Sequence, residues 1–477
     1  MLHTLKNNII CALATPHGRG AVAMVRASGK GAVEAVANLL DEPKREEILK
    51  AGGYSLHYAE IRSRGETLDQ VLIAVFRAPA SYTGEDSVEI SCHCSNYIIT
   101  ELLDLLYGEG VRLAGPGEFT KRAFLNGKMD LAQAESVADL IESETEAAHR
   151  LAMNQMKGGF SRELAEMRNQ MLKIVSLMEL ELDFSEEEVE FADRDELDAL
   201  LDKVMHRIGE LVSGFRLGNA IKNGIPVAIV GATNTGKSTL LNLLLGEDRA
   251  IVSPISGTTR DSIEDTVNIG GTLFRFIDTA GIRTATETIE MIGIERTYSK
   301  IKQAETVILM LDAEHPESFG MSISSLRDKL SDGQKTVIVL NKCDLLEENG
   351  KGPDLPTLLT SIRDIASRAG MPPAAVLHIS ALKGEGLDLL RKTLTELRPH
   401  AETSPDVTLV TNMRHYEALR SACDALARVK EGLAAKLSTD LLTQDLREAL
   451  YYIGTIVGEI SNEEVLDEIF GKFCIGK

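Results

Sequence analysis

The chain has 477 residues and a formal net charge of −21, and 44% of its residues are hydrophobic. This length favours about two to four domains, and the acidic balance argues against tight, unassisted binding of a polyanion by the whole surface. The cysteines lack the spacing of a disulfide or zinc framework, and no signal segment or bilayer-spanning apolar run is visible. We therefore expect a multidomain protein of the reducing cytoplasm.

Short apolar runs separated by turns fill the chain from Ile9 to about Pro116, with a helix-like stretch at 97–106. This mixture predicts a small α+β domain, to which we assign residues 1–120. The Cys92-His-Cys94 stretch lacks a second ligand pair, so it does not favour a metal site. Charged residues near the turns are either surface charges or parts of a ligand site: Arg19, Arg26, Glu89, Arg122 and Lys128.

Long helical periodicity replaces this pattern between Leu131 and about Leu217, and it returns near the end of the chain. We predict one discontinuous all-α domain, made of residues 121–220 and 391–477, with residues 221–390 inserted as a separate domain. We interpret the methionines of this helical domain as part of a buried packing face and not as a cofactor-binding motif. The apolar stripes are Leu164, Met167, Met171, Ile174, Met178 and Leu182, then Leu197, Leu201, Val204, Ile208, Leu211 and Phe215, and finally Leu442, Leu446, Leu450, Ile453 and Val457.

The stretch Gly231-Ala-Thr-Asn-Thr-Gly-Lys-Ser238 fits the phosphate-loop pattern G-x-x-x-x-G-K-S. It follows an apolar run and precedes a helix-like segment, where its glycines let backbone N–H groups surround a phosphate at a helix N-terminus. Lys237 is placed to reach the β- and γ-phosphates, and Ser238 to bind Mg²⁺. The sequence therefore predicts an inserted α/β P-loop domain of the Ras-like type.

Further stretches decide which nucleotide is bound. Thr259 offers a switch-loop hydroxyl for Mg²⁺ and the γ-phosphate, and the strand ending at Asp278 precedes Gly281, whose N–H can sense the γ-phosphate. Asn341-Lys-Cys-Asp344 ends another apolar run, and Ser380-Ala-Leu382 follows a third. The Asp344 carboxylate can accept from N1–H and the amine of guanine, a discrimination worth about 10⁴ or more, so we predict that the ligand is GTP.

The sequence gives only partial guidance on hydrolysis. Ile282 stands where Ras-like switches place a glutamine, so another group must align the attacking water, and Glu287, Glu290 and Glu295 are the candidates. No arginine finger can be identified. The amide of Asn234 either binds a monovalent cation that offsets phosphate charge or only shapes the loop, and both alternatives stay open.

The chain ends on Phe473-Cys-Ile-Gly-Lys477. A frayed terminus is the default expectation for such a segment. A free cysteine between two apolar residues is nevertheless unusual in a disposable tail. From the residues alone, a functional role for Cys474 and a plain frayed end are both open.

From end to end, the chain resembles the tRNA modification GTPase family MnmE, also called TrmE. The terminal F-C-I-G-K is the most specific sign, and four N-terminal stretches also match: Thr15-Pro-x-Gly-Arg-Gly20, Ser81-Tyr-Thr-Gly-Glu-Asp86, Pro116-Gly-Glu-Phe119 and Arg122-Ala-Phe-Leu-Asn126. The sequence departs from the family at Thr233, where proline is usual, and at His93-Cys-Ser95, where His-Gly-Gly is usual.

The resemblance implies a folate-binding N-terminal domain, with Arg26, Glu89, Lys128 and Lys477 contacting a tetrahydrofolate one-carbon carrier in its 5-formyl or 5,10-methylene form. It implies that Asn234, Ser253, Ile255 and Thr258 bind K⁺, that Ser238 and Thr259 bind Mg²⁺, and that Glu290 orients the hydrolytic water through a second water. Cys474 matches a cysteine needed for modification, which with Glu290 and Lys237 completes the expected catalytic residues. With the motifs, the expected GTP contacts are Asn234, Thr235, Gly236, Lys237, Ser238, Thr239, Ser253, Thr258, Thr259, Asp278, Thr279, Ala280, Gly281, Asn341, Lys342, Asp344, Ser380 and Ala381.

The implied function is a K⁺-activated GTPase that dimerises through its N-terminal domain. It works with an FAD-containing partner, MnmG (GidA), in a heterotetramer that adds an aminomethyl or carboxymethylaminomethyl group at C5 of the wobble uridine, position 34, of certain tRNAs. Two other classes compete with this one: a nucleotide-switched RNA-binding assembly factor, and a membrane or scaffold GTPase whose N-terminal region is a docking module. The absence of a recognisable RNA-binding module counts against the former, and the scaffold class has no use for Cys474.

Overall fold

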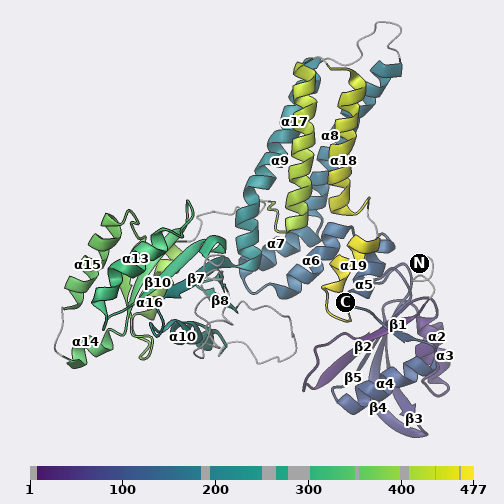
Figure 1. The fold of residues 1–477 in the computed structure, drawn as a ribbon. Helices are drawn as coiled ribbons and strands as arrows, with labels where there is room; N and C mark the ends of the chain where they lie inside the picture. The colour runs from purple at the N-terminus through teal and green to yellow at the C-terminus, as the bar shows by residue number, and fades with distance from the viewer. Residues whose placement is uncertain are drawn as a thin grey trace.

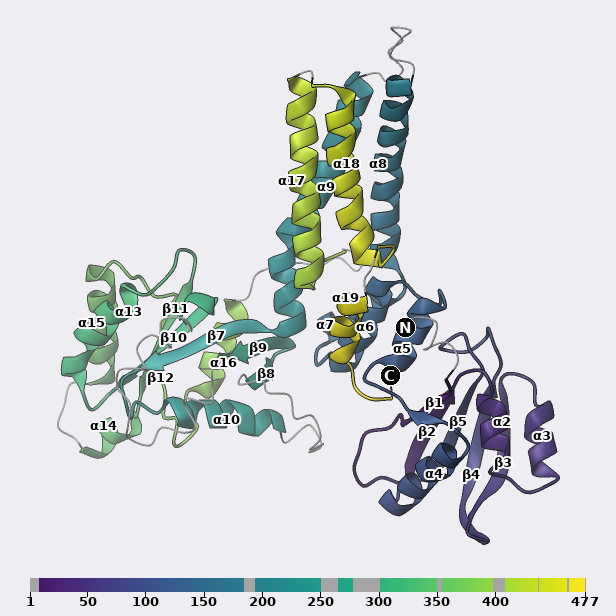
Figure 2. The same ribbon diagram turned by 45° about the vertical axis from the view of Figure 1, so that its right-hand side comes forward.

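The computed structural model describes residues 8–183, 194–249, 265–277, 301–349, 354–397, 408–435, 437–460 and 463–476. A bundle of long helices stands between two sheet-containing domains, one formed by the N-terminal part of the chain and the other by its middle (Figures 1 and 2). The predicted fold class is thereby confirmed: an α+β domain, a discontinuous helical domain and an inserted α/β domain.

The N-terminal domain is built on a sheet with the strand order β3-β4-β5-β2-β1-β6. Its pairs are antiparallel except for the short parallel pair between β1 and β6. Alternate residues of the central strands are buried, as the period of two in a half-buried strand requires. The elements are β1 (Ile10–Leu13), β2 (Val22–Ser28), α2 (Ala32–Ala37), α3 (Lys44–Lys50), β3 (Ser55–Ser63), β4 (Glu66–Phe76), β5 (Ser87–His93), α4 (Asn96–Gly108) and β6 (Arg112–Leu113).

Two separate parts of the chain form the helical domain. The helices α8 and α9 pack against α17 and α18, and the apolar stripes expected from the sequence form one continuous core, apart from Leu182, whose side chain lies outside the described part. The methionines Met167, Met171 and Met178 are buried in that core. The elements are α5 (Glu118–Leu125), α6 (Leu131–Glu142), α7 (Glu146–Met156), α8 (Gly159–Asp183), α9 (Arg194–Asn223), α17 (Met413–Ala434), α18 (Thr439–Val457) and α19 (Glu463–Gly471).

The inserted domain is a sheet with helices on both faces and the strand order β12-β11-β10-β7-β9-β8. All neighbouring strands are parallel except β8 and β9, so the described central strands read as nearly continuous apolar runs. The elements are β7 (Ile225–Gly231), α10 (Lys237–Arg249), β8 (Asp265–Ile269), β9 (Thr272–Phe276), β10 (Thr306–Asp312), η2 (Pro316–Ser318), α13 (Phe319–Arg327), β11 (Lys335–Asn341), α14 (Asp344–Asn349), α15 (Leu355–Arg368), β12 (Ala375–His378) and α16 (Leu387–Glu396).

The chain leaves and re-enters the helical domain at one place. It leaves along α9, and the returning segment before α17 crosses the same helix at two glycines. A Cβ on Gly214 would lie 3.1 Å from Leu409, and one on Gly218 would collide with the backbone carbonyl of Val410. These two glycines therefore allow the outgoing and returning segments to touch.

A buried charge cluster fixes the base of the helical bundle. The Glu135 carboxylate on α6 accepts hydrogen bonds from Arg414 Nε and Nη2, both at 3.0 Å, and lies 2.6 Å from His415 Nε2. Arg414 also donates to the carbonyls of Thr455 and Ile456 at the end of α18. Burial alone would raise the pKa of Glu135, but His415 and Arg414 outweigh it and hold the pKa at about 2.

The C-terminal tail is docked on the N-terminal domain. Ile475 forms an antiparallel bridge with Pro116, and Gly117 N–H donates to the Cys474 carbonyl at 3.4 Å. Gly476, with φ of 98°, sits so close to the Leu13 carbonyl that a Cβ would collide with it. The expectation of a frayed end is therefore wrong for the described residues up to Gly476.

A membrane-spanning helix is also not found in the described part of the chain, because none of its helices is both long and apolar enough to cross a bilayer.

The crossing at α9 yields a stability prediction. Gly218→Ala should lower the free energy of unfolding of the helical domain by about 1–3 kcal/mol, because the new methyl group has no space against Val410. Gly209→Ala is the matched control on the same helix; it has open space around it and should stabilise the domain by about 0.5–1 kcal/mol. Urea unfolding followed by circular dichroism measures both, and equal midpoints for the two variants would contradict the crossing.

Candidate nucleotide and tail-linked sites

The phosphate loop lies at the carboxyl end of β7 and leads into α10. Gly231 approaches β10 closely, since a Cβ there would lie 2.5 Å from the Met310 carbonyl, and Gly236 has φ of 93°. Asn234 also has positive φ, at 62°, which asparagine tolerates better than most residues. Its side chain is exposed, so the structure leaves both cation binding and loop shaping open for it.

The Lys237 ammonium group points into the loop. Its Nζ donates to the carbonyls of Gly231 at 3.0 Å and Ala232 at 2.5 Å. Burial lowers the pKa of Lys237, because removal from water disfavours the charged ammonium form. Ser238 and Thr239 follow in the first turn of α10, at the positive end of the helix.

Asn341 connects the two loops that the sequence assigns to phosphate and base. Its Nδ2 donates to the Thr235 carbonyl at 2.8 Å, and its Oδ1 accepts from Ala381 N–H at 2.9 Å. The residue is 3% exposed, and a Cβ on Gly236 would collide with its amide. Asn341 therefore holds the phosphate loop and the Ser380–Ala381 turn in one fixed arrangement.

The residues expected to recognise guanine lie beside this bridge. Asp344 is buried, and its Oδ2 lies 3.9 Å from Lys383 Nζ. Lys342 Nζ lies 2.6 Å from Asp312 Oδ2, and the hydrogen bond that it donates to this carboxylate raises the pKa of Lys342. The sequence analysis does not single out Asp312 and Lys383. Asp312 carried a usable signal, because it ends the apolar strand β10 at the same sheet edge as Asn341.

The remaining predicted contacts of the nucleotide domain lie outside the described residues, and the structure says nothing about them. They are Ser253, Ile255, Thr258, Thr259, Asp278, Thr279, Ala280, Gly281 and Glu290.

Arg26 and Glu89 form the centre of a second polar site, on the N-terminal sheet. They are register partners on β2 and β5, and the guanidinium donates to Glu89 Oε1 from Nε at 2.9 Å and from Nη2 at 2.8 Å. The guanidinium also lies over the rings of Tyr82 and Phe119, 5.6 Å from each centroid. The pair is thus held firmly while each side chain stays 21% exposed.

Lys128 borders the same loop as Arg26. Its Nζ donates to the Pro79 carbonyl at 3.0 Å, and its aliphatic stem lies against Gly84. Since Tyr82 of this loop covers Arg26, the structure brings Arg26, Glu89 and Lys128 around the 79–86 segment. Lys477, the fourth residue expected here, lies outside the described residues.

Arg122 is a buried structural residue and not an exposed charge. It is 4% exposed, and its two terminal nitrogens bind Glu85 Oε2 and Glu118 Oε1, both at 3.0 Å. Glu118 in turn binds Arg112. The stretches Ser81–Asp86, Pro116–Phe119 and Arg122–Asn126 therefore meet in one buried charge network, which positions the loop that carries Tyr82.

The tail reaches the same end of this sheet. Gly476 packs on Leu13, and Leu13 pairs with Val25, the neighbour of Arg26. Cys474 is exposed, and Phe473 beside it is buried.

The Cys92–Cys94 stretch makes other contacts. His93 Nδ1 lies 2.7 Å from Asp69, and Cys94 Sγ donates to the Gly18 carbonyl. No cluster of metal-ligating side chains occurs within the described residues.

A Gly-rich loop between a parallel strand and a helix, together with a buried Asn-Lys-x-Asp at a neighbouring strand end, defines a P-loop GTPase. Comparison with known proteins agrees. The model for the MnmE helical domain matches residues 131–474, and the one for the GTP-binding protein TrmE N-terminus matches residues 9–128. The chain belongs to the family of tRNA modification GTPases called MnmE.

Relatives with that name match this chain over its full length. The protein of Bacteroides thetaiotaomicron is 49% identical over 477 residues, which are 99% of this chain and 100% of the relative. That of Parabacteroides distasonis is 49% identical over 98% of this chain and 99% of the relative. That of Flavobacterium johnsoniae is 47% identical over 99% of this chain and 100% of the relative.

Asp344 gives the sharpest test of nucleotide choice. Asp344→Asn should raise KM for GTP by about 100-fold or more, because the amide cannot accept both guanine protons. Xanthosine triphosphate should become the better substrate, because the amide N–H can donate to its 2-oxo group. Asp328→Asn, on the surface of the same domain, is the matched control. An unchanged preference for GTP in steady-state hydrolysis would exclude Asp344 from base recognition.

Proposed function

We propose that this chain is a K⁺-activated GTP hydrolase that drives modification of the wobble uridine of certain tRNAs at C5. One observation carries the proposal: a single chain combines a P-loop nucleotide site with a cysteine-bearing tail docked on the domain that holds the Arg26–Glu89 pair. The relatives that match along the whole chain carry the name tRNA modification GTPase, which supports the same function.

The nucleotide site fits GTP on three observations. Lys237 is aimed at the loop carbonyls, where it would neutralise phosphate charge. Asn341 fixes the relative positions of the phosphate loop and the Ser380–Ala381 turn, so binding does not have to order them. The buried Asp344 has a carboxylate suited to guanine.

The ions and the attacking water are assigned by the proposal. Mg²⁺ would be held by Ser238 and Thr259, and K⁺ by Asn234, Ser253, Ile255 and Thr258; both ions supply positive charge that offsets the charge of the phosphates. Glu290 would orient the attacking water. Of the proposed K⁺ ligands, Asn234 is the one that lies within the described residues. Its exposed amide and left-handed backbone are compatible with a cation ligand.

The second site would bind a tetrahydrofolate one-carbon carrier. Arg26 and Lys128 offer positive charge for a carboxylated ligand, and the ring of Tyr82 and the guanidinium of Arg26 offer flat surfaces for an aromatic one. Lys477 would complete the site. Cys474 is exposed at the adjoining tail, so its thiol is available to a substrate brought to this end of the sheet.

The proposal includes partners and a location. The chain would form a homodimer through its N-terminal domain and assemble with an FAD-containing MnmG (GidA) subunit into a heterotetramer. The partner would supply flavin chemistry and help an acidic chain to bind tRNA. No disulfide joins cysteines within the described residues, which fits the proposed location in the reducing cytoplasm.

Cation dependence tests the hydrolysis part directly. GTP hydrolysis by the purified chain should be much faster in K⁺ than in Na⁺ buffer, and Glu290→Ala should lose about 10²-fold in kcat, the usual effect of removing a group that activates water. Glu287→Ala and Glu295→Ala serve as matched controls, because they remove the neighbouring acids. Equal rates in both salts would reduce Asn234 to loop shaping and call for an external activator.

Cys474 tests the link to modification. Cys474→Ser should leave GTP hydrolysis unchanged and abolish formation of modified uridine in a reaction with the flavoprotein partner and tRNA, because a serine hydroxyl does not reproduce thiolate chemistry. Cys423→Ser, in α17, controls for loss of a thiol elsewhere. Full modification by the Cys474 variant would favour a GTPase whose N-terminal region is a docking module.

A further inference from the structure

Helix α9 belongs to both domains that it joins. Leu211 packs in the helical core, whereas Ala220 in the last turns packs in the core of the GTPase domain beside Val227. Gly224, with φ of 82°, then turns the chain into β7, which leads to Gly231. Because no linker separates α9 from the phosphate-loop strand, the end of the helix must move when that strand moves.

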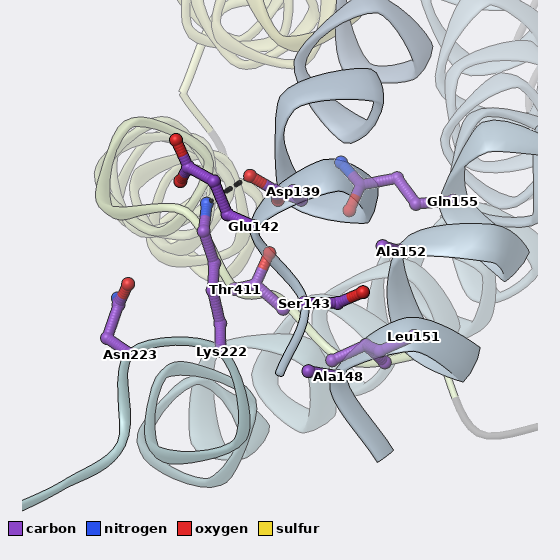
Figure 3. A pocket seen from close by; sticks show the side chains of 10 residues that line it. All are labelled: Asp139, Glu142, Ser143, Ala148, Leu151, Ala152, Gln155, Lys222, Asn223 and Thr411. Atoms are coloured by element: carbon purple, nitrogen blue, oxygen red, sulfur yellow. Dashed lines mark ion pairs between the residues drawn. The ribbon is translucent and has the colours of Figure 1, made fainter. Parts of the chain in front are cut away.

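The last turn of α9 is tied to α6 by an ion pair. Lys222 Nζ lies 2.8 Å from Asp139 Oδ1, with side-chain exposures of 25% and 14% (Figure 3). Burial raises the pKa of Asp139, and Lys222 opposes that effect. The position of Lys222 therefore matters electrostatically to α6, and the loss of either partner leaves the other largely buried and without this counter-charge.

A small cavity adjoins the ion pair. It has a volume of about 40 Å³, and Asp139, Lys222 and Thr411 line it (Figure 3). The buried hydroxyl of Thr411 has no hydrogen-bond partner among the described residues, and the cavity is large enough to hold a water molecule. Such a space lets the ion pair change its geometry without repacking of the helices around it.

The GTPase domain holds the same end of α6 through a second contact. On β8, Asn268 Nδ2 donates to the Glu144 carbonyl at 3.1 Å, and Thr266 Oγ1 donates to the Glu144 carboxylate at 3.4 Å. Glu144 lies between α6 and α7. In sequence, β8 follows shortly after Thr259, one of the proposed Mg²⁺ ligands. The phosphate loop and the segment that contains Thr259 are therefore each connected, within a short length of chain, to the same end of α6.

The other half of α6 contacts the segment that carries Cys474. Glu135, one helical turn from Asp139, holds the end of α18 through Arg414. Leu131, the first residue of α6, shares a core cluster with Phe470 and Phe473, the latter adjacent to Cys474. A single helix therefore spans the distance between the junction with the GTPase domain and the docked tail.

We propose that α6 couples the nucleotide state of the GTPase domain to the position of Cys474, with Lys222 and Asp139 as positioning residues at the end that the GTPase domain contacts. The inference rests on the proposed function, because it requires that the chain binds and hydrolyses GTP. Neither residue touches the nucleotide site. If the ion pair only stabilises the junction, its loss lowers stability but leaves the response of Cys474 to nucleotide unchanged.

The test uses the full chain and measures the alkylation rate of Cys474 by iodoacetamide, with peptide mass spectrometry to separate it from the other thiols. In wild type the rate should differ by about fivefold or more between GDP and GDP with aluminium fluoride in K⁺ and Mg²⁺, the usual lower range of allosteric coupling. In Lys222→Met and Asp139→Asn the ratio should fall close to one, while GTP hydrolysis keeps its rate.

Two controls separate coupling from damage. The exchange Asp139→Lys with Lys222→Asp restores an ion pair and should restore the ratio. Arg216→Met breaks the ion pair between α9 and Glu305 of the GTPase domain without touching α6, and should leave the ratio unchanged. Three results would overturn the inference. The ratio of alkylation rates stays unchanged in both single variants, or it is lost in Arg216→Met, or a wild-type chain that hydrolyses GTP shows no response of Cys474 to nucleotide. Absence of GTP hydrolysis in wild type instead contradicts the proposed function.

Discussion

The close crossing of two chain segments at α9 is the constraint on which the architecture depends. An inserted domain needs its two ends near each other. Here the outgoing helix and the returning segment before α17 touch at Gly218 and Val410. Because Ala220 already packs in the GTPase core, the crossing and the domain boundary lie within one turn of helix. The GTPase domain is therefore attached by a stiff connection on one side, which sets it apart from a domain on a flexible tether.

The candidate sites follow from this arrangement. Parallel strands of the inserted sheet deliver the phosphate loop, Asn341 and Asp312 to one edge, where a single buried amide joins the loops for phosphate and base. On the other side of the bundle, α19 and the tail bring Cys474 to the N-terminal domain, where its backbone carbonyl accepts from Gly117 and its neighbour Ile475 pairs with Pro116. The helical domain lies between these sites, so its buried charge pairs, in which one lost partner costs several kcal/mol, decide how rigidly they are connected.

The sequence predicted what local rules determine. The phosphate loop, the apolar stripes and the insertion were predictable, because the spacing of glycines and apolar residues specifies them. Strand β3 carries little signal in the sequence, because exposed residues alternate along it and only Ala59 and Ile61 are buried. Arg122 was predicted only as a surface or ligand charge, since its partner Glu85 lies 37 positions away, and Glu135 and Arg414 are 279 apart. No local pattern records such pairings, nor the docking of the tail on Leu13.

The central claim is that the direct junction of α9 with β7, acting through α6, joins nucleotide chemistry to the tail. A Gly-Ser-Gly insertion between Asn223 and Gly224 interrupts that continuity without altering either site, and uridine modification is then measured in the presence of the flavoprotein partner, GTP and tRNA. GTP hydrolysis retained with modification lost is the predicted result. Modification at the wild-type rate would contradict the claim, because it would mean that the GTPase domain acts on the tail without the stiff connection.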